Sequence, residues 1–139
     1  MARMTTRILL DTHVFLWIFL DPKRVPAKVK AFLRDDPKTE VYFSHVSSWE
    51  IAIKFGRGKL SLPQPPDDFV RSRIAKAAWL HLPIELDHVL NVFRLPAIHK
   101  DPFDRLLISQ AKAENMPILT SNPRFSDYDV DCVKFSDLT

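Results

Sequence analysis

The chain has 139 residues, so we expect a single domain over residues 1–139. Its net charge of +3 favours an anionic partner such as RNA only weakly. Ten phenylalanines and a hydrophobic fraction of 46% can form a core, and the single cysteine excludes an intrachain disulfide framework and makes a cysteine-type zinc site improbable. No apolar run approaches the roughly 20 residues that span a bilayer and we identify no signal peptide, so we expect a cytoplasmic protein.

The first predicted elements are a strand and a helix. Residues 7–10 (RILL) form the continuous apolar run that is typical of a parallel strand buried on both faces. Residues 12–20 follow as a helix, with Asp11 or Thr12 as its N-cap. The sequence therefore places a carboxylate directly between two apolar elements.

The next predicted elements repeat this order. A short amphipathic helix is expected over 27–36, followed by a strand over 40–44. Ser44 is a natural cap for a helix over 45–59, which ends in the only two glycines of the chain.

The second half continues in the same way. A proline-rich connector precedes a helix over 67–79, and a third strand is expected over 80–84. Helices over 85–95 and 99–115 follow, the second with Pro102 in its first turn. The last expected strands lie at 116–120 and around 131–135.

Strands that alternate with helices predict an α/β fold with a mostly parallel sheet of four to five strands and helices on both faces. In such a sheet, ligands bind in the crevice outside the carboxyl ends of the strands. Asp11 directly follows the first strand, so we expect it at that crevice.

Other polar side chains are expected at the same edge. Glu50 lies in the helix after the second strand, and Asp101 and Asp104 open the long helix. Thr120 and Asn122 follow the fourth strand. Carboxylates gathered at one edge repel each other, and a divalent cation with a preference for oxygen ligands, Mg²⁺ or Mn²⁺, is the usual compensation.

Each acidic residue also has a simpler explanation. Asp11 can be a plain N-cap and Glu50 a charge on a solvated helix face. Asp101 before a proline is a common cap arrangement, and Asp104 can be a surface charge that the helix dipole stabilises. Taken singly, these residues leave both explanations open.

The remaining residue types exclude several chemistries. The five histidines show no HxxxH or HxH spacing, so we expect no zinc site and place most of them at the surface or at helix starts. Two glycines, at 56 and 58, exclude the dinucleotide-binding and phosphate-loop motifs. Trp17, Trp49 and Trp79 fall in apolar helical patterns, so we expect core packing rather than base stacking.

Four segments of the chain carry a family resemblance: LLDTHVFLW, SSWEIAIKFGRGKL, HKDPFDRLLISQA and ILTSNPRFSDYDV. In this order they resemble the motif series of PIN domains, closest to the VapC-type toxins of bacterial toxin–antitoxin pairs. The resemblance covers essentially the whole chain and implies a small α/β/α nuclease that hydrolyses RNA phosphodiester bonds with Mg²⁺ or Mn²⁺.

The resemblance also implies roles for individual residues. Asp11, Glu50 and Asp104 match the family's catalytic, metal-binding acids, and Asp101 lies close enough to contribute to the metal. Asn122 stands where the family commonly has Asp. We therefore expect one tightly held metal ion, and a second that binds only with substrate phosphate or at high Mn²⁺ concentration. The family pattern gives Thr120 and Asn122 supporting positions behind the ligands.

Four basic residues near the motifs, Lys54, Arg57, Lys59 and Arg105, are candidates for contacts with RNA phosphates, with solvated surface charge as the alternative. The resemblance implies a homodimer and a small antitoxin that lies along the toxin and inhibits it.

Two other functions fit part of the sequence. A PIN fold with a degenerate site that only binds nucleic acid or protein is favoured by Asn122. A receiver-like signalling domain would need paired acids after an early strand and a lysine at the end of a late one. The chain offers Asp11 alone and no lysine in ILTSN, so this second alternative is disfavoured.

Overall fold

The computed structural model describes residues 6–138 and contains a five-stranded sheet in the order β3-β2-β1-β4-β5. Each pair of neighbouring strands is parallel, which confirms the predicted α/β fold. The strands are β1 (Thr6–Leu10), β2 (Thr39–Ser44), β3 (Leu80–Leu82), β4 (Ile118–Leu119) and β5 (Cys132–Val133).

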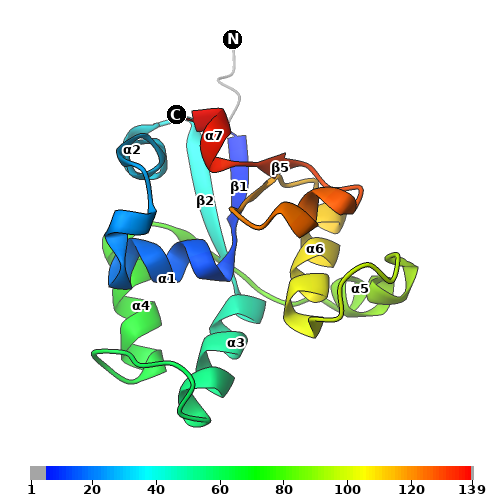
Figure 1. Cartoon of the computed structure of the whole chain (residues 1–139), viewed down its shortest axis with the longest axis horizontal. Coiled ribbons are helices and arrows are strands. Elements are labelled where there is room, and N and C mark those ends of the chain that lie inside the picture. Colours follow the sequence, from blue (N-terminus) through cyan, green and yellow to red (C-terminus); the bar gives the residue numbers. More distant parts are fainter. Residues whose placement is uncertain (1–5, 139) are drawn as a thin grey trace.

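Helices connect the strands and cover both faces of the sheet (Figure 1). The α-helices are α1 (Thr12–Leu20), α2 (Ala27–Asp35), α3 (His45–Gly56), α4 (Pro66–Ala77), α5 (Leu86–Leu90), α6 (Pro102–Glu114) and α7 (Phe135–Leu138). Short 3₁₀ segments are η1 (Pro22–Arg24), η2 (Asn91–Arg94) and η3 (Pro123–Asp127). The helix expected over 85–95 is thus divided into α5 and η2, because the chain tightens before Pro96, which disfavours helix in the residue preceding it.

The apolar run in β1 is explained by burial on both faces. Ile8 and Leu10 pack into the core on one side of the sheet, and Leu9 packs into the core on the other. All three are at most 1% exposed. The alternation of side chains along a strand therefore requires apolar residues at every position.

The two cores are built from different helices. The larger one contains Phe15 of α1, which stacks on Phe43 of β2 with ring centroids 4.1 Å apart, and Phe69 of α4. The other contains Leu107 and Ile108 of α6. Figure 1 shows α1, α2 and α4 on one side of the sheet and α5 and α6 on the other.

The strand order creates a switch point at the centre of the sheet. From β1 the chain proceeds outward through β2 and β3, and then returns to place β4 on the other side of β1. Parallel sheets form their ligand-binding crevice where the order reverses, outside the carboxyl ends of the central strands. Asp11 follows β1 and Thr120 follows β4, so both lie at this point.

One expectation about side-chain burial is wrong. Trp49 is 50% exposed, although Trp17 and Trp79 pack against the core as expected. His88 lies in the first turn of α5, and it is 1% exposed because its ring closes a hydrogen-bonded junction between α5 and α6.

Over residues 6–138, none of the helices combines the length and the hydropathy that a bilayer span requires.

Candidate metal-binding active site

Asp11 occupies the N-cap position of α1, but its side chain makes no capping hydrogen bond. Its Oδ2 instead accepts a hydrogen bond of 2.8 Å from the Thr120 hydroxyl, across the boundary between β1 and β4. Its Oδ1 is buried and has no hydrogen-bond partner among the described residues. A buried carboxylate oxygen without a partner is costly, so this geometry argues against a simple capping role.

Glu50 is oriented toward the crevice from the second turn of α3. Ser44 begins this helix as predicted, because its hydroxyl accepts the backbone N–H of Val46. The Glu50 side chain is 2% exposed, and its Oε2 accepts a hydrogen bond of 2.5 Å from Lys54 Nζ. Its Oε1 is buried and unpartnered within the described part of the chain, as one oxygen of Asp11 is. Glu50 is therefore not a solvated surface charge.

Asp104 lies in the first turn of α6 and is held by a histidine. His99 Nε2 lies 2.8 Å from Asp104 Oδ2. The His99 Nδ1 faces the backbone N–H of Asp101 at 3.4 Å and accepts from it, so Nε2 carries the hydrogen that Asp104 accepts. Asp101 itself caps α6, because its Oδ1 accepts from the backbone N–H groups of Phe103 and Asp104.

The acidic side chains influence one another electrostatically. Burial, and then the charges of Asp101, Asp11 and Glu50, raise the pKa of Asp104 to about 6 against the lowering effect of the hydrogen bond from His99. Burial also raises the pKa of Asp11, with a smaller upward contribution from Glu50. Upward pKa shifts of Asp11 and Asp104 are expected where carboxyl groups are buried near other acids and away from water.

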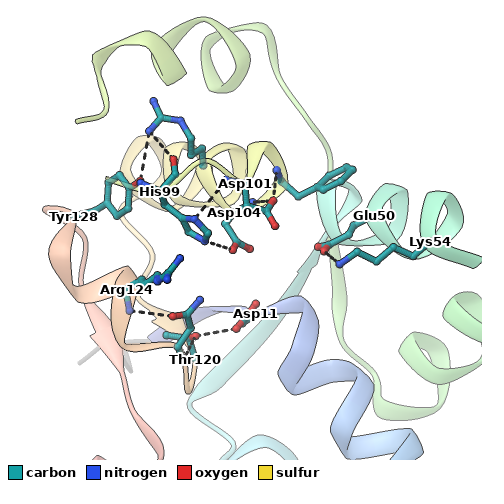
Figure 2. Close-up of polar contacts among 12 residues, drawn as sticks. Asp11, Glu50, Lys54, His99, Asp101, Asp104, Thr120, Arg124 and Tyr128 are labelled. Atoms are coloured by element: carbon teal, nitrogen blue, oxygen red, sulfur yellow. Dashed lines mark hydrogen bonds and ion pairs between the residues drawn. The ribbon is translucent and has the colours of Figure 1, made fainter. Parts of the chain in front are cut away.

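Figure 2 shows the carboxylates of Asp11, Glu50 and Asp104 oriented toward one space between the end of β1, α3 and α6. Within residues 6–138, no group of three or more His, Cys, Asp or Glu side chains is close enough to hold a metal ion as the side chains stand. The donor chemistry nevertheless fits a divalent cation with oxygen ligands, because two carboxylate oxygens there are buried without a partner.

Thr120 and Asn122 lie behind Asp11 as a short hydrogen-bonded chain. The Thr120 hydroxyl donates to Asp11 and accepts from the backbone N–H of Asn122 at 2.9 Å. The Asn122 side chain caps η3 by accepting from the backbone N–H of Arg124 at 3.0 Å. Figure 2 places Arg124 beside Thr120, which adds an exposed cation at this rim that the sequence analysis did not select.

The four candidate phosphate contacts differ in what they touch. Lys54 is paired with Glu50, and the charges of Glu50, Asp101 and Asp104 raise its pKa against the lowering effect of burial. Arg57 and Lys59 are exposed after the end of α3. Arg105 instead donates to the backbone carbonyls of Val92, Leu95, Pro96 and His99 and to the hydroxyl of Tyr128. This engagement argues against the predicted phosphate contact for Arg105, which secures the loop before α6.

His99 is absent from the predicted site residues because the histidines show no metal-ligand spacing. A usable signal was present, since His99 lies two residues before the cap of α6 and can return to the first turn of that helix.

A buried acidic crevice at the switch point of a doubly wound parallel sheet defines this protein as an α/β domain with a candidate cation site. The sequence profile of the PIN domain matches residues 8–131, so the chain belongs to the PIN domain family. This confirms the family that the four motifs indicated.

Chains in several solved complexes have a similar fold. VapBC2 from Rickettsia felis bound to a DNA fragment from its promoter contains a chain with 13% identity, a TM-score of 0.68, and coverage of 93% of this chain and 98% of that one. DNA-bound VapBC from Salmonella typhimurium contains a chain with 13% identity and a TM-score of 0.72, with coverage of 94% of this chain and 99% of that one. VapBC-1 from nontypeable Haemophilus influenzae contains a chain with 15% identity and a TM-score of 0.65, with coverage of 94% of this chain and 99% of that one.

At these identities the likeness establishes the fold alone. A search of curated proteins found no match.

Proposed function

We propose that this protein is a divalent-metal-dependent endoribonuclease that acts in the cytoplasm as the toxin of a toxin–antitoxin pair. The observation that carries the proposal is the pair of buried carboxylate oxygens without partners, Asp11 Oδ1 and Glu50 Oε1, at the switch point of a PIN fold. Nucleases of this family generally use divalent metal ions. The likeness to chains of VapBC complexes supports the toxin assignment.

Asp11, Glu50 and Asp104 would hold Mg²⁺ or Mn²⁺, with Asp101 contributing charge from the cap of α6. When bound, the cation would lower the pKa of a coordinated water and polarise the phosphodiester. Three carboxylates suffice to compensate one divalent cation, whereas Asn122 adds an oxygen without charge. We therefore expect one tightly bound ion.

The reaction is in-line attack of water on phosphorus, which breaks the bond to the 3′ oxygen and leaves a 3′-hydroxyl and a 5′-phosphate. The Thr120 hydroxyl and the His99 ring fix the orientation of Asp11 and Asp104 through single hydrogen bonds. Glu50 can bind the metal or orient the attacking water. Lys54 compensates Glu50 in the free protein and lies near enough to the acids to contact a substrate phosphate.

An apolar groove offers a site for the antitoxin. A cavity of about 460 Å³ between α1, α2 and α4 is lined by apolar Ile18, Phe19 and Trp79 and by basic Lys30, Arg34 and Lys76. An apolar floor with a basic rim suits an amphipathic segment with acidic residues. We assign this groove to the antitoxin, and Lys30→Glu together with Lys76→Glu should weaken toxin–antitoxin binding in a pull-down with the cognate antitoxin.

A second apolar surface supports a homodimer. Leu86, Val89, Leu90 and Phe93 on α5 and η2 are between 47% and 76% exposed. Contiguous exposed apolar side chains of this kind mark protein interfaces. Light scattering should therefore give a dimer mass for the wild type and a lower mass for Phe93→Ser.

The proposal is tested by incubating the purified protein with a mixture of structured and single-stranded RNA. We expect cleavage with Mg²⁺ or Mn²⁺, loss of cleavage in EDTA, and loss in Glu50→Gln at unchanged helix content. The exposed Glu40→Gln is the matched control and should cleave as the wild type does. A wild-type protein that binds RNA without cleaving it under any metal condition would instead identify a binding module with a degenerate site.

A further inference from the structure

The aromatic pair formed by Trp49 and Phe103 borders the acidic crevice. Trp49 is 50% exposed, and its ring meets that of Phe103 edge to face with centroids 4.8 Å apart. Trp49 precedes Glu50 on α3, and Phe103 precedes Asp104 on α6. The pair thus bridges the same two helices as the carboxylates, on the solvent side.

We propose that Trp49 is a stacking platform for an unpaired nucleobase of single-stranded RNA, held in place by Phe103. This inference rests on the proposed ribonuclease function, because a phosphodiester at the carboxylates brings the attached base to the rim of the crevice. The indole presents a face to solvent while its edge is supported, and every base can stack on such a face. The contact with Phe103 gives the half-exposed Trp49 ring a fixed position next to the two buried acids.

The ligand is a base rather than a second protein chain because of what surrounds the ring. The residues next along the chain, Glu50 and Asp104, are buried and acidic, and Lys54 of the same helix as Trp49 is paired with Glu50. The large exposed apolar side chains gather elsewhere, on α5 and η2. One half-exposed indole beside a candidate phosphodiester site matches the dimensions of one base, not those of a protein interface.

The test measures RNA binding in Ca²⁺, which takes oxygen ligands as Mg²⁺ does, and a gel of the same samples checks that the RNA is intact, so that the reading does not depend on cleavage. A 5′-fluorescein-labelled, ten-nucleotide single-stranded RNA is titrated with wild type, Trp49→Phe and Trp49→Leu, and read by anisotropy. Leucine keeps the apolar character and removes the aromatic face, so we expect binding weakened about tenfold or more, whereas phenylalanine should stay within about threefold of wild type. In the wild type, unlabelled RNA should also quench tryptophan emission, and the quenching should disappear in Trp49→Phe.

The matched control is Phe55→Ala. Phe55 is an exposed aromatic residue on the same helix, six positions farther and therefore about 240° around the helix axis. It should bind RNA as the wild type does. Equal RNA affinity of Trp49→Leu and wild type would overturn the proposal, as would an absence of RNA binding by the wild type. A changed oligomeric mass in Trp49→Leu with unchanged RNA affinity would show a protein interface instead.

The result is separable from the proposed function. Trp49-dependent RNA binding without cleavage in Mn²⁺ would remove the ribonuclease activity and leave the platform. Metal-dependent cleavage with the same KM in wild type and Trp49→Leu would remove the platform and leave the ribonuclease.

Discussion

Two buried polar regions of this protein are equally deep but differ in how completely they are hydrogen-bonded. At the junction of α5 and α6, the His88 ring accepts from the backbone of Glu85 and contacts Glu114 at 3.2 Å. Gln110 is fully buried, accepts from the Ser44 hydroxyl and donates to the Pro83 carbonyl. At the acidic crevice, Asp11 and Glu50 each leave one buried oxygen without a partner.

The contrast separates structural from functional polarity. A network whose members all have partners stabilises the fold, whereas buried carboxylates left incomplete cost stability and are retained for a ligand. Substitutions in the two regions should therefore change stability in opposite directions. The following experiments test that difference, in order of decreasing expected effect.

Asp104→Asn should give the largest change in activity. It removes a ligand charge at nearly constant shape, and the His99 ring can still donate to the amide oxygen. We expect RNA cleavage to fall at least about a hundredfold, since even groups behind metal ligands contribute ten- to a hundredfold. Without metal, the variant should be more stable than wild type by about 1–3 kcal/mol at pH 7.5, because a charge whose burial is unfavourable is gone. Urea unfolding in EDTA, beside the cleavage assay, measures both. Cleavage at the wild-type rate would remove Asp104 from the site.

Gln110→Leu should have the opposite effect on stability. It leaves the Ser44 hydroxyl and the Pro83 carbonyl buried without their partner, at about 1–3 kcal/mol for each unsatisfied group. We expect urea unfolding to show a loss of about 2–4 kcal/mol, while Mn²⁺ affinity of the folded protein stays unchanged. An unchanged free energy of unfolding in Gln110→Leu would show that the junction adds no stability and would contradict the contrast between the two regions.

The metal-free protein should become more stable when the pH falls from 7 to 5. The ordinary pKa of an aspartate is 3.8, and the pKa of Asp104 in the folded protein is about 6. The folded state therefore disfavours the charged form of Asp104. The destabilisation is complete above pH 6 and is relieved as the carboxyl takes up a proton between about pH 6 and 4. We expect this group to contribute about 1 kcal/mol between pH 7 and 5 in urea unfolding with EDTA. Asp104→Asn should lack this contribution, and an identical pH profile in both proteins would contradict the assignment.

Asn122→Asp should give the smallest change. Aspartate can cap η3 in the same way, and its charge adds Coulomb attraction for a cation on the order of 1 kcal/mol. We expect Mn²⁺ affinity to rise about fivefold and the apo melting temperature to fall slightly. Unchanged values of both would show that residue 122 lies outside the acidic cluster.

The sequence predicted most of the fold and the acidic positions, for identifiable reasons. A strand buried on both faces needs the run at 8–10, and a carboxylate directly after it must lie at the sheet edge. The N-cap of α6 at Asp101 could be predicted because Asp followed by Pro is a common arrangement at the start of a helix.

The misses around the candidate site concern which way a side chain points. Trp49 and Arg105 lie on helices whose pattern does not fix which neighbour each residue meets. Trp49 is half exposed and meets Phe103 of α6 edge to face, and Arg105 donates to carbonyls of the preceding loop. Such contacts depend on tertiary packing, which periodicity does not encode.

The most direct test of the account is a calorimetric titration of Mn²⁺ into metal-free wild type and Asp11→Asn at pH 7.5. Asp11 is the residue whose buried oxygen lacks a partner at the centre of the switch point, and asparagine keeps its shape and its contact with Thr120. We predict one binding site per chain in the wild type and an affinity at least about tenfold weaker in the variant, because one ligand charge is lost. Equal affinity in the two proteins, or no binding by the wild type, would contradict a cation site at this crevice.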